Sequence, residues 1–157
     1  MWYNYGNCII LTKVMIMDQK FTNQLSGATL AYLGDAVLEV LVRRYLVSLG
    51  IADGGALSHF ALRFVRATAQ SAGMDKLMPH LTEDEEYMFK RGRNANGISI
   101  PKSASAVEYR RATGMEALFA YLDLSGQSER AEQLFSLAFA DVMAELEETK
   151  QNGGLQK

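Results

Sequence analysis

The sequence predicts an all-α fold, and three observations support that prediction. The chain has only two prolines and is rich in Ala, Leu, Met and Glu, which are good helix formers. Apolar residues recur at the spacing of amphipathic helices, and no segment alternates apolar and polar residues as a half-buried strand would. Two Ser/Thr-x-x-Glu patterns, typical of helix-capping boxes, begin at Thr82 and Ser105.

The first predicted helix runs from Gln24 to about Ser48 and ends at Gly50. It has apolar residues on nearly all sides, which predicts a central, buried helix. A Gly-rich linker at residues 52–55 follows it. The second helix is then predicted from apolar residues at i, i+3, i+4 and i+7 spacing. These residues are Leu57, Phe60, Ala61, Phe64, Val65, Thr68, Ala69 and Ala72.

Three further helices are predicted downstream. The third follows the Thr82 cap and has acids in its first turn and bases in its last, as the helix dipole favours. Residues 94–97 interrupt it, and Pro101 delays the next helix. The fourth runs from Ser105 through Leu124. The last begins at Ser128, and its apolar residues are Leu134, Phe135, Ala138, Val142 and Leu146.

A chain of 157 residues can form one domain with a sizeable core. We expect residues 1–20 to be an N-terminal extension, 21–150 the folded domain and 151–157 a flexible tail. The apolar stretch within residues 1–16 is too short to span a bilayer and lacks the features of a signal peptide. We interpret residues 1–16 as a mis-called start or a disordered extension, because Met17 is a more natural beginning.

The cysteine and histidine residues argue against a zinc protein, and the distribution of charge indicates a local basic surface. Cys8, His59 and His80 are too few and too scattered for a zinc site, and a single cysteine fits a reducing cytoplasm. The net charge of −2 does not itself indicate a nucleic-acid partner. Locally, however, residues 90–111 have six basic residues and one acid, which predicts a basic patch on an acidic protein.

Two acids stand inside long apolar, helix-like runs, where an ionised carboxylate is costly unless a cation pairs with it. Glu116 has mostly apolar neighbours one turn away in either direction, so it is either functional or part of a buried ion pair. Asp35 is followed by Glu39 and Arg43 at helical spacing, so the three residues could equally form a solvated face. A pair of carboxylates suits Mg²⁺, which prefers oxygen ligands and keeps several waters.

Three segments together resemble the catalytic domain of the ribonuclease III family. Gly34-Asp35-Ala36 and Glu116-Ala117-Leu118, with their flanks, are similar to the two signature segments of that domain. The segment at 90–95, Lys-Arg-Gly-Arg-Asn-Ala, resembles the stand-alone branch called Mini-ribonuclease III. The resemblance extends from about residue 25 to residue 123.

The resemblance implies a Mg²⁺-dependent endoribonuclease that cleaves double-stranded RNA, with Asp35 and Glu116 as catalytic and metal-binding residues. The fuller family pattern has four acids, and the other two fall here at Ala31 and Thr113. The short branch shares this reduced set. We also expect no separate RNA-binding domain, because about thirty residues follow Gly126. The branch further implies maturation of the 23S ribosomal RNA precursor, a ribosome-associated substrate, a homodimer and a cytoplasmic location.

The basic residues are the predicted RNA contacts, because Lys and Arg beside a Gly/Asn loop can bind phosphates and 2′-hydroxyls. The alternative is that they only cap a helix C-terminus. An alternative function is a catalytically silent protein that binds structured RNA during ribosome assembly, and another is a helical interaction module without an RNA role. The predicted RNA-binding residues are Lys90, Arg91, Arg93, Asn94, Lys102 and Arg110.

Overall fold

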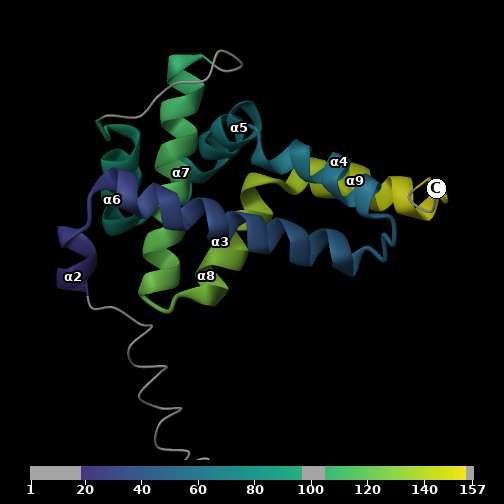
Figure 1. Cartoon of the computed structure of the whole chain (residues 1–157), viewed down its shortest axis with the longest axis horizontal. Coiled ribbons are helices and arrows are strands. Elements are labelled where there is room, and N and C mark those ends of the chain that lie inside the picture. The colour runs from purple at the N-terminus through teal and green to yellow at the C-terminus, as the bar shows by residue number, and fades with distance from the viewer. Residues whose placement is uncertain (1–18, 97–104, 155–157) are drawn as a thin grey trace, which may run out of the picture.

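The computed structural model of the chain describes residues 19–96 and 105–154, and every regular element in these ranges is helical (Figure 1). The predicted all-α fold is confirmed. The interpretation of residues 1–16 and the roles of Cys8 and Lys102 lie outside the described ranges. The elements are α2 (Gln19–Gln24), α3 (Gly27–Ser48), α4 (Gly54–Val65), α5 (Ala67–Leu77), the 3₁₀ turn η1 (Met78–His80), α6 (Glu83–Arg93), α7 (Ala106–Leu124), α8 (Ser128–Ala138) and α9 (Ala140–Gln151).

Helix α7 is the centre of the fold, and α3, α5, α6 and α8 pack around it (Figure 1). Eleven of its residues are buried, from Ala112 to Leu124. The sequence predicted α3 as the central helix, and this was wrong. Tyr32, Val40 and Val47 of α3 are 85%, 52% and 62% exposed. Apolar residues surround α3 because one of its faces, which includes these three residues, is left uncovered by the part of the chain that the structure describes.

The predicted starts of α6 and α7 are confirmed. Thr82 and Ser105 each form a complete capping box, with Glu85 and Glu108. Ser26 caps α3 by accepting a hydrogen bond from the Thr29 backbone N–H, so this helix begins three residues after the predicted Gln24. Residues 19–24 form the separate helix α2, which was not predicted.

Two predicted helices are each divided in two. The second predicted helix breaks at Arg66, where ψ changes to 142° and the backbone becomes extended. The last one breaks at Phe139, which has a φ of −112° and a ψ of 18°. Neither position has a glycine or proline to signal the break. The chain turns at Arg66 because α4 packs on α3 whereas α5 packs on α7, and one straight helix could not reach both.

A cluster of aromatic side chains joins the C-terminal end of α4 to three neighbouring segments. The ring of Phe64 lies 5.3 Å from that of Phe139, 6.0 Å from that of Phe135 and 5.8 Å from that of Tyr45. These contacts connect α4 with α3, α8 and the α8–α9 junction. No helix in the described ranges has the length and apolar content that a bilayer crossing requires.

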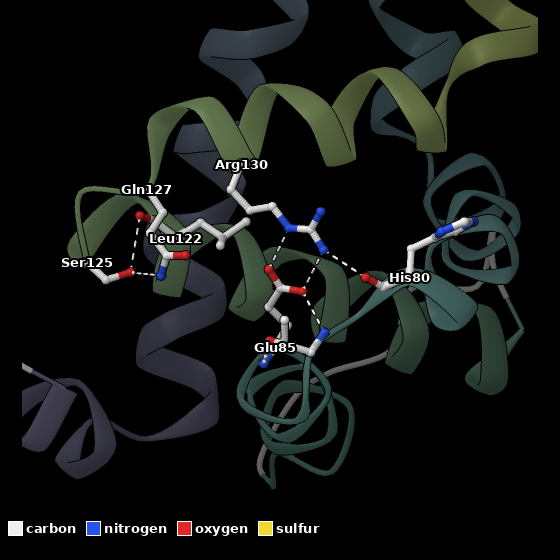
Figure 2. A network of polar contacts seen from close by, with 7 residues as sticks. His80, Glu85, Leu122, Ser125, Gln127 and Arg130 are labelled. Carbon is white, nitrogen blue, oxygen red and sulfur yellow. Dashed lines mark hydrogen bonds and ion pairs between the residues drawn. The ribbon is translucent and has the colours of Figure 1, made fainter.

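Glu85 and Arg130 tie α6 to α8 (Figure 2). Glu85 is 2% exposed, and its carboxylate accepts hydrogen bonds from Arg130 Nε and Nη2 at 2.8 and 3.0 Å and from the Thr82 backbone N–H at 2.8 Å. Arg130 Nη2 also donates to the His80 carbonyl at 2.7 Å. Burial alone would raise the pKa of Glu85, but the hydrogen bonds from Arg130 and Thr82 outweigh it and lower that pKa. The carboxylate therefore stays ionised at neutral pH and links the two helices.

Candidate active site

Helices α3 and α7 cross in backbone contact at Gly34. A Cβ atom at Gly34 would lie 1.7 Å from the backbone oxygen of Glu116, so no larger residue fits between the two helices. Asp35 is the next residue on α3, and Glu116 is the residue that Gly34 touches on α7. The crossing thus brings together the two acids that stand 81 positions apart in the chain.

The two acids have different environments. Asp35 is exposed, whereas Glu116 is partly buried. Burial first, and then the negative charge of Asp35, raise the pKa of Glu116 to about 8. In the part of the chain that the structure describes, neither carboxylate takes part in a hydrogen bond or an ion pair with a basic residue. Glu116 is therefore not half of a buried ion pair with any of these residues.

The alternative interpretation of Asp35, a solvated face shared with Glu39 and Arg43, describes only the last two residues. Arg43 Nε lies 2.7 Å from Glu39 Oε2, so these two residues form a surface ion pair. Asp35 is outside this pair and interacts electrostatically with Glu116. A second carboxylate beside Glu116, without a basic partner among the described residues, is the arrangement that a bound cation would stabilise.

The donor set fits a hard divalent cation that keeps part of its water shell. Among the described residues, no group of three or more His, Cys, Asp or Glu side chains could enclose a metal. Two carboxylates are what Mg²⁺ commonly takes from a protein, leaving positions for water and substrate phosphate. Ala31 and Thr113 add no ligand, since the Thr113 hydroxyl donates to the Tyr109 carbonyl at 3.0 Å.

Helix α6 packs on α7 at a second glycine contact, close to the acids. A Cβ at Gly92 would lie 2.5 Å from the Thr113 carbonyl oxygen and 2.5 Å from Ala117 Cβ. The basic C-terminal turn of α6 therefore lies beside the turn of α7 that holds Glu116. Gly92 itself is a sequence signal of this contact. A glycine inside a helix costs roughly 1 kcal/mol relative to alanine, so its presence between basic residues indicates a close approach.

The basic residues of α6 point to different partners. Lys90 forms an ion pair with Glu86 at 2.7 Å. Arg91 donates to the backbone carbonyls of Leu25 and Thr22, at the end of α2. We therefore assign Arg91 a structural role in place of the RNA contact that the sequence predicted. Charge alone could not distinguish these roles, because the carbonyl partners come from a segment more than sixty residues away.

The remaining predicted RNA contacts stay available. Arg93 donates from Nε to Asn94 Oδ1 at 3.2 Å, and Asn94 itself is exposed. Arg110 is exposed on α7, six residues before Glu116. Its neighbour Arg111 instead pairs with Asp75 and donates to the Ser71 carbonyl at 3.1 Å. The geometry thus favours Arg93, Asn94 and Arg110 as the surface available to a polyanion near the two acids.

Comparisons with known proteins agree with this arrangement. The sequence model of the ribonuclease III domain matches residues 28–127, which include both acids and the basic turn of α6. The chain is 50% identical to the Mini-ribonuclease 3 of Symbiobacterium thermophilum over 73% of this chain and 88% of the relative. It is 46% identical to the Mini-ribonuclease 3 of Enterococcus faecalis over 72% of this chain and 87% of the relative.

A solved structure supports the fold independently. The crystal structure of a protein from Fusobacterium nucleatum superposes with a TM-score of 0.68 at 28% identity, covering 75% of this chain and 94% of that one. Nucleases of the matched family generally depend on a divalent metal, which fits the paired acids at the helix crossing. From the family match and the curated relatives together, the chain belongs to the ribonuclease III family of endoribonucleases, within its Mini-ribonuclease III branch.

Proposed function

We propose that this endoribonuclease uses Mg²⁺ at Asp35 and Glu116 to hydrolyse phosphodiester bonds in double-stranded RNA. The observation that carries the proposal is the contact of α3 and α7 at Gly34, which places two acids together without a basic partner in the described residues. When bound, the ion supplies Lewis acidity at the scissile phosphate and lowers the pKa of a water. The family match supports a double-stranded RNA substrate.

The residues of the chain have separate tasks in this reaction. Glu116 must lose its proton before it can act as a ligand, because burial and Asp35 raise its pKa to about 8. Arg93 and Arg110 provide positive charge for phosphates near the acids. Neither Arg93 nor Arg110 forms an ion pair with a described carboxylate, so RNA binding would not have to break one.

The specific substrate that we propose is the precursor of 23S ribosomal RNA, presented in a ribosome-associated form in the cytoplasm. This rests on the likeness to Mini-ribonuclease III. The alternative is a catalytically silent protein that binds structured RNA during ribosome assembly. The acids at the crossing favour the enzyme, because RNA binding alone needs cations and gains nothing from two carboxylates beside the phosphates.

Cleavage of a generic RNA duplex separates the two functions. We expect the purified protein to cut the duplex in Mg²⁺ and to leave it intact in EDTA, with binding retained in Ca²⁺. A protein that binds the duplex equally well in all conditions and never cuts it would support the assembly factor. Cutting that persists undiminished in EDTA would contradict the metal site.

We further propose a homodimer formed through the exposed face of α3. Tyr32, Val40 and Val47 lie on one side of this helix and are all more than half exposed. Beside them, α3 and α8 line a hollow of about 260 Å³ that includes Ala36 and Val37. An uncovered apolar stripe of this kind is characteristic of an isologous interface, in which the same face of each subunit meets its copy.

Val40→Glu should convert the dimer to a monomer. A charge in the middle of the apolar stripe would be desolvated twice in a symmetric interface, so we expect the dissociation constant to rise at least about a hundredfold. Sedimentation velocity across a range of concentrations measures the change. Val107→Glu is the matched control, because Val107 is 68% exposed on α7, outside the stripe. Equal sedimentation of the wild type and Val40→Glu at every concentration would remove the proposed interface.

A further inference from the structure

Arg91 and Arg93 each lie over an aromatic ring one turn earlier on α6, but only Arg91 also binds the backbone at the end of α2. The guanidinium carbon of Arg93 lies 5.6 Å from the centre of the Phe89 ring. The guanidinium thus lies over the ring, and its Nε donates to Asn94 Oδ1. Its two terminal nitrogens make no hydrogen bond within the described ranges. Two parallel N–H groups at an open edge match the geometry of a phosphate.

The Phe89 ring is itself fixed against the helix of the active site. Phe89 is 2% exposed. A Cβ at Gly114 would lie 2.5 Å from Phe89 Cδ2 and 2.6 Å from Cε2, so the ring rests directly on the α7 backbone. Gly114 precedes Glu116 by two residues. One rigid aromatic side chain therefore connects the backbone beside Glu116 to the guanidinium of Arg93.

From this geometry, we infer that Phe89 is a positioning residue that holds Arg93 as a bidentate phosphate contact at a fixed distance from the Asp35–Glu116 pair. The inference rests on the proposed function, since it concerns how the same site binds RNA. A lysine or a freely moving arginine would supply the charge without the fixed orientation. Lys90 and Arg91 cannot substitute, because the first pairs with Glu86 and the second binds the end of α2.

The test compares Phe89→Leu, Arg93→Ala and the double variant by duplex binding in Ca²⁺ and by cleavage in Mg²⁺. Arg93→Ala should raise Kd and KM about tenfold. The slope of log K against log salt should become shallower by the amount expected for the loss of about one phosphate contact. Phe89→Leu should raise Kd and KM about threefold and leave kcat within about twofold, because it removes only the cation–π support. The double variant should bind like Arg93→Ala alone, since Phe89 acts through Arg93.

Phe64→Leu is the control for lost core packing. Phe64 is 1% exposed but belongs to the aromatic cluster with Phe135 and Phe139. It should lower the thermal midpoint as Phe89→Leu does and leave Kd unchanged. An equal rise of Kd in Phe64→Leu, or additive effects of Phe89→Leu and Arg93→Ala, would overturn the inference.

Arg93→Lys decides the question if Phe89→Leu fails to fold. Lysine keeps the charge but loses the stacked, forked guanidinium, so we expect it to retain the salt slope and still bind about threefold more weakly than wild type. Wild-type affinity in Arg93→Lys would overturn the inference. In every case the wild type's cleavage in Mg²⁺ is measured in parallel, so failure of the positioning role is distinguished from failure of the proposed function.

Discussion

Asp35→Asn and Glu116→Gln should each reduce single-turnover cleavage of an RNA duplex about a thousandfold or more. Both changes preserve the shape of the side chain and remove the charge that would hold the metal, and a bound metal supplies several kcal/mol of transition-state stabilisation. Duplex binding in Ca²⁺ should fall much less, because the phosphate contacts come from Arg93 and Arg110. Additional Mg²⁺ should not restore full activity to either variant. Wild-type cleavage by either one would exclude these residues as the metal site.

Both variants should remain folded, and the stability of Glu116→Gln provides an internal check. The pKa of Glu116 rises from an ordinary 4.5 to about 8 in the folded protein, so the native state binds this proton more tightly than the unfolded chain. In the metal-free wild type, the protonated Glu116 therefore contributes to stability at low pH, and this contribution is lost as the pH rises from about 4.5 to about 8. Glutamine does not titrate, so the variant should gain stability relative to wild type as pH rises through that window.

Denaturant unfolding of metal-free protein at about pH 5 and about pH 8.5 measures this difference. The Asp35→Asn variant should show a smaller dependence on pH than wild type, because removal of its charge lowers the cost of ionising Glu116. Parallel curves for wild type and Glu116→Gln would show that Glu116 titrates normally in the folded protein. If one of the two variants fails to fold, the cleavage result for the variant that does fold tests the metal site.

Gly34→Ala should be the most damaging glycine-to-alanine substitution among the glycines that the structure describes. The new Cβ would stand 1.7 Å from the Glu116 backbone oxygen, so α3 and α7 would have to separate along their contact. Overpacking of this severity costs roughly 3 kcal/mol or more. Because the same contact places Asp35 beside Glu116, we also expect cleavage to fall more than the loss of folded protein explains.

Gly54→Ala is the matched control for this substitution. No atom lies within 4 Å of a Cβ built at Gly54, and this residue is also at a helical position. Alanine there should be neutral or should stabilise the protein by about 0.5 kcal/mol. Thermal unfolding and single-turnover cleavage well below the transition temperature are measured for both variants. If Gly34→Ala has the same thermal midpoint and the same cleavage activity as Gly54→Ala, the close crossing of α3 and α7 is contradicted.

The parts of the fold that the sequence predicted are those encoded in a few adjacent residues. The capping boxes at Thr82 and Ser105 are local patterns, so the sequence identified the residue at which α6 and α7 each begin. The divisions at Arg66 and Phe139 could not, because apolar periodicity continues through both positions. What ends those helices is the direction of the neighbouring helices, and direction is a property of the whole fold.

In the candidate site, too, the sequence identified the residues, whereas their surroundings depend on segments far away in the chain. The resemblance to ribonuclease III selected Asp35 and Glu116, but only the crossing at Gly34 shows why they meet. The sequence also could not assign Arg91, because its partners are backbone carbonyls that any residue would supply. Likewise, apolar residues all around α3 are compatible with a fully buried helix or with an exposed apolar face, and the 85% exposure of Tyr32 excludes the fully buried helix.

The ion pair of Glu85 with Arg130 has a consequence for exchanging segments between related enzymes. Glu85 belongs to α6, whose basic end lies beside the turn of α7 that holds Glu116, whereas Arg130 belongs to α8. A transplanted α6 without a carboxylate at this position would leave Arg130 without its ionic partner and the Thr82 backbone N–H without its acceptor. Residues 82–93 and Arg130 are therefore structurally coupled, and chimeras designed to alter RNA preference should exchange them together.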